Sequence, residues 1–131
     1  MSIFASKSRR WFLIASIGSA LLIVWHWPLA ANRGRLSARL DIAIGRPQIL
    51  TYGIVTPTHN EYARLLKDRY GIKTRAVAGC IVSSSLVTYV SSYNEETRTA
   101  ELNRFGHDIF TETREQADAN VQREIAEGKI Y

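Results

Sequence analysis

One cysteine and two histidines are the residues of this chain whose types and neighbours favour covalent chemistry. Cys80 is the only cysteine among 131 residues, and His59 and His107 are the histidines that follow an apolar N-terminal segment. A thiol becomes a nucleophile when a histidine or a helix N-terminus lowers its pKa. Asp108 directly follows His107 and is of the type that orients a histidine base. One hypothesis is therefore a small thiol-dependent enzyme with Cys80 as nucleophile and His107 or His59 as base.

A non-catalytic interpretation of the same residues is favoured. Cys80 lies in the apolar run Ala-Val-Ala-Gly-Cys-Ile-Val, and a free cysteine in such a run commonly behaves as a small buried hydrophobe. His59 fits an exposed position in a first helical turn, and His107 fits a loop before the last helix. The sequence contains no phosphate-binding glycine loop, zinc-protease, C-x-x-C or serine-hydrolase motif. A binding or scaffold protein is therefore the first expectation and the thiol enzyme is the alternative.

Composition excludes several other classes. With one cysteine and two histidines beyond the apolar segment, we expect no metal site and no cofactor, and one cysteine cannot form an intramolecular disulfide. The net charge is +5, but residues 1–40 hold six basic and no acidic residues, while the remainder holds the other 11 basic and all 12 acidic ones. No basic surface with interleaved aromatics follows, so a nucleic acid is not expected as partner. The expected partner of the basic N-terminal part is the lipid bilayer with its anionic headgroups.

The apolar segment predicts a transmembrane helix over residues 11–31. No charged side chain occurs from Trp11 to Asn32, and about 20 apolar residues suffice to cross a bilayer as a helix. Tryptophans at the two ends of the segment fit the interfacial belts of a membrane. The residues expected to anchor the segment at the two interfaces are Trp11, Trp25, Trp27, Arg9, Arg10, Arg33 and Arg35.

The uncleaved signal anchor is favoured over a cleaved signal peptide, because the apolar run exceeds the usual h-region of 7–15 residues. The alternative is secretion after cleavage near Ala31. The basic N-terminus favours a cytoplasmic tail and an extracytoplasmic domain. The predicted organisation is a basic tail, a transmembrane helix, an amphipathic juxtamembrane connector and one small α/β domain, at residues 1–10, 11–31, 32–46 and 47–131.

The connector has the periodicity of an amphipathic helix. Leu36, Leu40 and Ile44 recur every four residues, and Gly45 ends the pattern. Two interpretations carry equal weight. The leucine stripe docks on a lipid surface, or it packs on the chain's own domain.

The domain itself begins with a predicted βαβ unit. A strand near 48–52, a helix over 59–70 and a strand over 73–78 follow from the hydrophobic patterns, with Thr58 and Glu61 as a capping box and Gly71 as the left-handed residue after the helix. The two strands are expected to be parallel with a right-handed crossover. The predicted fold class is a small α/β domain, α+β-like, with a short parallel sheet and additional helices.

Two further helices are expected after the βαβ unit. Residues 83–106 favour a helix over a third strand at LVTYV, and Asp108 is the expected N-cap of a last helix over about 109–127. Their predicted inward-facing residues are Leu86, Val90, Tyr93, Leu102 and Phe105 in the first, and Phe110, Ala117, Val121 and Ile125 in the second.

The parallel sheet locates the expected ligand site. Ligands of open α/β sheets bind outside the carboxyl ends of the strands, where a helix N-terminus also attracts anions. Gly53, Thr58 and Gly79 are the expected ligand contacts at that edge. The function predicted first is a single-pass membrane-anchored binding, accessory or scaffold module, whose partner is a membrane protein or a second copy in a homo-oligomer. An immunity-type inhibitor fits the same pattern.

Overall fold

The computed structural model describes residues 29–129. The predicted basic tail and all but the last three residues of the predicted transmembrane helix lie outside this range, as do Trp11, Trp25, Trp27, Arg9 and Arg10. Within the described range, no helix has the length and apolarity required to cross a membrane.

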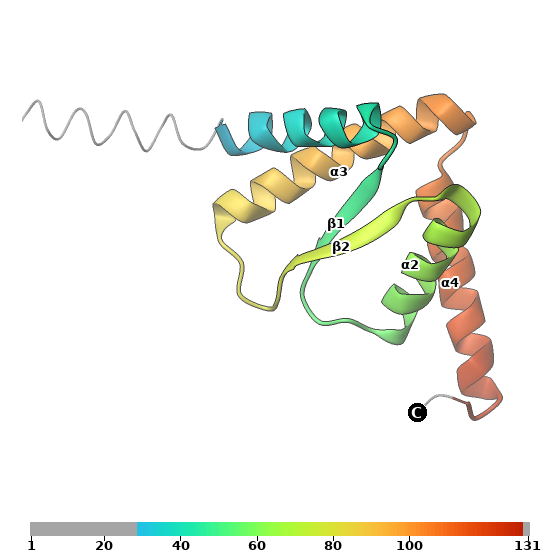
Figure 1. Ribbon diagram of the computed structural model, residues 1–131. Helices are drawn as coiled ribbons and strands as arrows, with labels where there is room; N and C mark the ends of the chain where they lie inside the picture. Colours follow the sequence, from blue (N-terminus) through green and yellow to red (C-terminus); the bar gives the residue numbers. More distant parts are fainter. Residues whose placement is uncertain (1–28, 130–131) are drawn as a thin grey trace, which may run out of the picture.

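The described chain folds into helices around a two-stranded parallel sheet (Figure 1). An N-terminal helix over residues 29–43 is followed by β1 (Gln48–Tyr52), α2 (Pro57–Tyr70), β2 (Lys73–Ala78), α3 (Ser84–Phe105) and α4 (Ile109–Ala126). The predicted βαβ unit with parallel strands is confirmed, and so is the helix rather than a strand over 83–106. The small mixed α and β domain is therefore as expected.

The sheet separates two apolar clusters because neighbouring residues of a strand point to opposite faces. Ile49 of β1 packs toward α2 and α4, whereas Leu50 packs toward α3 and the N-terminal helix. Figure 1 shows the same two layers, with α2 and α4 side by side on one face. The buried members of the larger cluster are Ile49, Tyr62, Leu65, Leu66, Ile72, Ile109, Phe110 and Ala117. Those of the smaller are Ala38, Leu50, Val90 and Tyr93.

The start of α2 corrects the predicted capping box. The helix begins at Pro57, and Thr56 is its N-cap, whose side-chain oxygen accepts the backbone N–H of His59 at 3.2 Å. Proline suits the first helical position because no N–H is needed there, which moves the start ahead of Thr58. Glu61 is bound instead by Arg64 at 2.7 Å and by Asn120 of α4 at 2.7 Å.

The end of α2 is as predicted. Gly71 has φ 70°, and its N–H donates to the carbonyl of Lys67. The N–H of Ile72 donates to the carbonyl of Leu66, and the Ile72 side chain is fully buried. The Gly71 bond is the 5→1 bond of the αL C-cap motif, and with the burial of Ile72 it turns the chain directly into β2.

The inward face of α3 differs from the prediction in its second half. Val90 and Tyr93 are buried as expected, but Leu102 is 46% exposed. The buried stripe instead continues through Thr97 and Glu101, because α3 extends past the short sheet and faces α4 there. The C-terminal half of α3 therefore buries polar side chains that the apolar pattern did not identify.

In α4 the N-cap is confirmed and the last predicted core residue is wrong. Asp108 accepts the backbone N–H groups of Phe110 and Thr111 at 3.0 and 3.2 Å. Phe110, Ala117 and Val121 are buried as predicted, whereas Ile125 is 48% exposed. Its turn lies past the start of α2, so nothing covers it.

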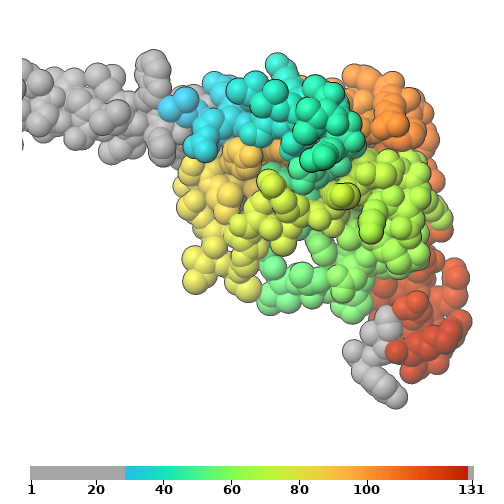
Figure 2. Space-filling view, viewed as in Figure 1, coloured from blue at the N-terminus to red at the C-terminus, as the bar shows by residue number. Residues whose placement is uncertain are grey.

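The N-terminal helix packs through small residues and leaves its leucine stripe outside. Ala30, Gly34 and Ala38 are buried, and a Cβ at Gly34 would lie 2.4 Å from the carbonyl oxygen of Tyr89 in α3. The interpretation in which Leu36, Leu40 and Ile44 pack on the domain is wrong, because these side chains are 58–63% exposed. Figure 2 shows this helix, in blue to green, lying across one side of the molecule with its outer face uncovered. Docking on lipid stays a prediction.

Candidate functional site

The carboxyl ends of the two strands meet, as the parallel sheet requires. The N–H of Gly53 lies 3.3 Å from the carbonyl of Ala78 and 3.1 Å from that of Gly79. Gly53 has φ 100°, which favours glycine. The loops that leave this edge carry exposed apolar side chains, with Ile54 79% and Ile81 95% exposed. Gly53 and Gly79 therefore bond to each other, and neither lines the cavities described below.

Cys80 is exposed in the loop after β2. The expected core position is wrong, because β2 ends at Ala78 and the apolar run continues into a surface loop. Within residues 29–129 no hydrogen bond joins Cys80 to a histidine. The thiol is therefore accessible, and no described histidine activates it through a hydrogen bond.

His107 lies at the far end of α3 from Cys80. The helix has 22 residues, which is about 33 Å at 1.5 Å per residue, and Figure 1 shows the two loops at its opposite ends. The His107 ring contacts Glu112 at 3.3 Å and the carbonyl of Phe105 at 3.1 Å. Asp108 caps α4 and makes no contact with the ring. The structure thus does not bring together the predicted pair of Cys80 and His107.

His59 and Thr58 line a cavity of about 350 Å³ at the carboxyl end of β1. The first turn of α2 forms one wall, as the predicted edge site requires, and α3 and α4 form the others. The complete lining comprises Ile49, Leu50, Thr51, Thr56, Thr58, His59, Tyr62, Asn94, Arg98, Arg114 and Asp118. Of the three expected ligand contacts, only Thr58 belongs to it.

Two arginines from different helices face this cavity. The guanidinium of Arg98 lies 5.0 Å from the ring centroid of Phe110, and that of Arg114 lies 5.3 Å from the ring centroid of Tyr62. In the described part of the chain, neither arginine forms an ion pair. Asp118 is the carboxylate of the lining, so two cations and one anion line the cavity.

The hydroxyl of Tyr62 is buried beside these cations. Tyr62 is 5% exposed, and its oxygen has no hydrogen-bond partner of normal geometry among residues 29–129. Burial raises the pKa of Tyr62, and the charges of Arg98 and Arg114 oppose that rise, together with a polar contact from the Arg114 side chain that falls short of normal hydrogen-bond geometry. The phenol therefore stays protonated at neutral pH and is a donor. A buried hydroxyl left unpaired costs about 1–3 kcal/mol.

Asn94 lines the cavity and bonds to the edge of β1 that does not pair with β2. Its amide nitrogen donates to the carbonyl of Leu50, and its amide oxygen accepts the N–H of Leu50, both at 2.8 Å. This pair reproduces the hydrogen bonds of a neighbouring strand. The apolar pattern of the sequence did not identify Asn94, Arg98 or Arg114. The four-residue interval between Asn94 and Arg98 places both on one face of a helix. That interval predicts a shared site only when the inward face of α3 is known.

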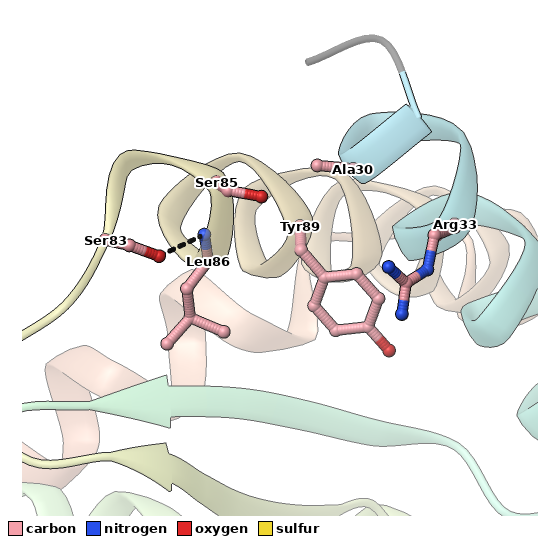
Figure 3. Close-up of a pocket in the computed structure, with 6 residues that line it drawn as sticks. All are labelled: Ala30, Arg33, Ser83, Ser85, Leu86 and Tyr89. Carbon is pink, nitrogen blue, oxygen red and sulfur yellow. Dashed lines mark hydrogen bonds between the residues drawn. The ribbon is translucent and has the colours of Figure 1, made fainter. Parts of the chain in front are cut away.

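A second cavity of about 290 Å³ lies between the N-terminal helix and the start of α3. Figure 3 shows its lining, with Arg33 and Tyr89 facing each other. Ser83 is occupied as the N-cap of α3, where it accepts the N–H of Leu86 at 3.2 Å. Arg33, expected at the membrane interface, thus also lines this cavity. The complete lining comprises Ala30, Arg33, Ser83, Ser85, Leu86 and Tyr89.

Within residues 29–129, no group of three or more histidine, cysteine, aspartate or glutamate side chains is placed to hold a metal ion. Comparisons with protein-family models, with curated proteins and with solved structures found no match. The cavity formed by β1, α2, α3 and α4, called the arginine cavity below, is therefore the candidate functional site.

Proposed function

We propose that the chain is a membrane-anchored, non-catalytic binding module whose ligand occupies the arginine cavity. One observation carries this proposal. The cavity combines two arginines that form no ion pair within residues 29–129 and a buried tyrosine hydroxyl that has no hydrogen-bond partner of normal geometry there. Buried polar groups of native proteins are nearly always hydrogen-bonded, and a ligand would supply the absent partner.

The thiol-dependent alternative has less support. The exposure of Cys80 favours it, but a thiol enzyme also needs a base within hydrogen-bond reach of the sulfur. His107 is at the other end of α3, and His59 makes no hydrogen bond to Cys80 in the described residues. A binding function requires no such pair.

The membrane attachment is supported by the uncharged segment and by the surface beside it. Residues 11–32 carry no charge, and the helix that follows exposes Leu36, Leu40 and Ile44. Arg33 and Arg35 on the same helix suit anionic headgroups. We propose an anchor across the bilayer, a leucine stripe toward lipid and the domain on the extracytoplasmic side, with secretion after cleavage near Ala31 as the alternative. A membrane protein or a second copy remains the proposed macromolecular partner.

The test of the binding function is thermal unfolding of the full chain in a non-ionic detergent against a panel of anionic, neutral and cationic small compounds. A ligand at a hundred times its Kd adds about 2.7 kcal/mol to stability, so a true ligand raises Tm visibly. We expect at least one compound to raise Tm of the native chain and to leave Arg98→Gln/Arg114→Gln unchanged. If no compound of any charge class does so, the proposed binding function is wrong.

A further inference from the structure

The arginine cavity has the donor set of an oxyanion site. Arg98 comes from α3 and Arg114 from α4, and each stacks on an aromatic ring that fixes its guanidinium. The charges of both act on Tyr62 of α2. Planar guanidinium groups bind carboxylates and phosphates through paired hydrogen bonds. Two such groups beside one buried O–H donor match the oxygens of one anionic group.

The surrounding residues restrict the ligand further. Thr58 lies in the first turn of α2, where the helix dipole favours negative charge, and Ile49 of β1 adds an apolar wall. Asp118 lines the same cavity and contributes a negative charge, which opposes ligands of high charge and favours a donor group next to the anion. With Arg98 and Arg114, the formal charge of these three side chains is +1.

We propose that the arginine cavity binds a small oxyanion, a carboxylate or a phosphate, held by Arg98 and Arg114 with Tyr62 as hydrogen-bond donor. This inference rests on the proposed binding function and names the chemistry of its ligand. The anion belongs to a soluble acid or to a lipid headgroup, since the same group recognises either. A compound panel in which only neutral or cationic ligands bind would preserve the binding function and overturn this inference.

The first experiment follows amide and arginine side-chain NMR resonances of the full chain in nanodiscs during titration with acetate and with inorganic phosphate. Potassium chloride at matched ionic strength is the reference. We expect saturable shifts at Thr58, Arg98 and Arg114, with binding at least about tenfold weaker in Arg98→Gln and Arg114→Gln, because each loses a charge-assisted hydrogen bond. Arg123→Gln is the matched control on α4. Its position is nine residues from Arg114 and so on the opposite face, and its affinity should equal that of the native chain.

The second experiment separates a ligand contact from a packing role. Tyr62→Phe keeps the ring under Arg114 and removes the unpaired hydroxyl. We expect a higher Tm in the absence of ligand and a several-fold weaker affinity for acetate or phosphate. Asp118→Asn should bind either anion about threefold tighter, because a like charge near the site is removed. Unchanged affinity in Tyr62→Phe, Arg98→Gln and Arg114→Gln, or no saturable shift with either anion, overturns the proposal.

Varying the lipid of the nanodisc distinguishes a lipid headgroup from a soluble acid as the source of the anion. Nanodiscs of phosphatidylcholine are compared with nanodiscs that contain phosphatidylglycerol, without added anion. Shifts at Arg98 and Arg114 with phosphatidylglycerol, reversed by phosphate, support the site and assign it a lipid headgroup. Shifts with soluble acetate or phosphate alone support the site and assign it a soluble acid. Shifts at Thr58 with phosphatidylglycerol that persist in Arg98→Gln/Arg114→Gln overturn it.

Discussion

At the scale of single residues, the polar side chains inside this domain differ in whether their hydrogen bonds are satisfied. Asn94 replaces an absent strand beside β1. Tyr93 is fully buried, and its hydroxyl donates a short hydrogen bond to Asp41 of the N-terminal helix. Tyr62 is the opposite case, a buried hydroxyl with no hydrogen-bond partner of normal geometry among residues 29–129. Two of these residues stabilise the fold, and the third carries the binding proposal.

Asn94→Ala should destabilise the domain strongly. Leu50 is 1% exposed, so its N–H and C=O would both lose their partner without access to water. At about 1–3 kcal/mol for each unpaired group, we expect a loss of about 3 kcal/mol in the free energy of unfolding. Urea unfolding of the full chain in detergent measures it. Asn60→Ala, at an exposed position of α2, is the control and should change stability by less than about 0.5 kcal/mol.

Tyr93 should make the fold sensitive to alkali. Its pKa is raised well above the usual value of about 10, first by burial and then by the hydrogen bond and charge of Asp41, against the charge of Arg75. Above pH 10 the unfolded chain loses this proton while the folded chain keeps it. Its contribution to stability is therefore complete below pH 10 and is lost as pH rises.

Urea midpoints between pH 9 and pH 12 check this expectation. The midpoint should fall less steeply with pH in Tyr93→Phe than in the native chain. Tyr70→Phe, on the other side of the sheet, should leave the slope as it is. Equal slopes in all three proteins would show that Tyr93 is not the group responsible.

At the scale of elements, the packing of the N-terminal helix on α3 depends on small side chains. Ala30, Gly34 and Ala38 let the two backbones approach, so the larger Leu36 and Leu40 remain outside. The apolar periodicity alone suggested the opposite face. A helix with both a small-residue face and a leucine face has two surfaces for packing, and the domain uses the first.

Gly34→Ala is the test of this contact. In an exposed helix the change would stabilise by about 1 kcal/mol through helix propensity. Here the new Cβ would meet backbone at 2.4 Å, and overpacking of this kind costs about 1–3 kcal/mol. We expect a net loss of stability on urea unfolding, whereas Asn32→Ala on the exposed face should be neutral or stabilising. A stabilised Gly34→Ala would mean that the two helices separate easily.

At the scale of the whole molecule, the single exposed cysteine reports the proposed topology without any engineered label. Cys80 is the only cysteine in the chain and lies in a surface loop. A membrane-impermeant maleimide added to intact bacterial cells that express the chain should label Cys80 if the domain is extracytoplasmic. Labelling only after the cells are opened would reverse the orientation.

The anchor itself is tested by charge. Each arginine at the centre of a membrane helix costs about 2.5–3.5 kcal/mol on insertion scales. Leu21→Arg/Val24→Arg should therefore release the chain from membranes in alkaline extraction. Ile54→Arg/Val55→Arg, the same change in an exposed loop, should leave it bound. Release of the native chain would favour the secreted alternative.

Most of the local structure of the domain could be predicted from the amino-acid sequence. Gly71, Asp108 and the apolar patterns located helix ends and strands, because caps and periodicity depend on residues a few positions apart. The pattern predicted Thr58 as the N-cap of the helix, whereas the N-cap of α2 is Thr56, two residues earlier. Thr58 and His59 were placed correctly at the carboxyl edge of β1 by the topology of a βαβ unit.

Contacts between side chains that are far apart in the sequence depend on the tertiary packing of the elements. Asn94 bonds a residue 44 positions away, and Arg98 and Arg114 face one cavity from two helices whose rotation is set by packing. Cys80 and His107 looked compatible in type, yet the length of α3 separates them. Exposure of Leu36 and Ile125 likewise depends on the extent of the neighbouring elements. Such contacts join distant positions, and local propensity carries no information about them.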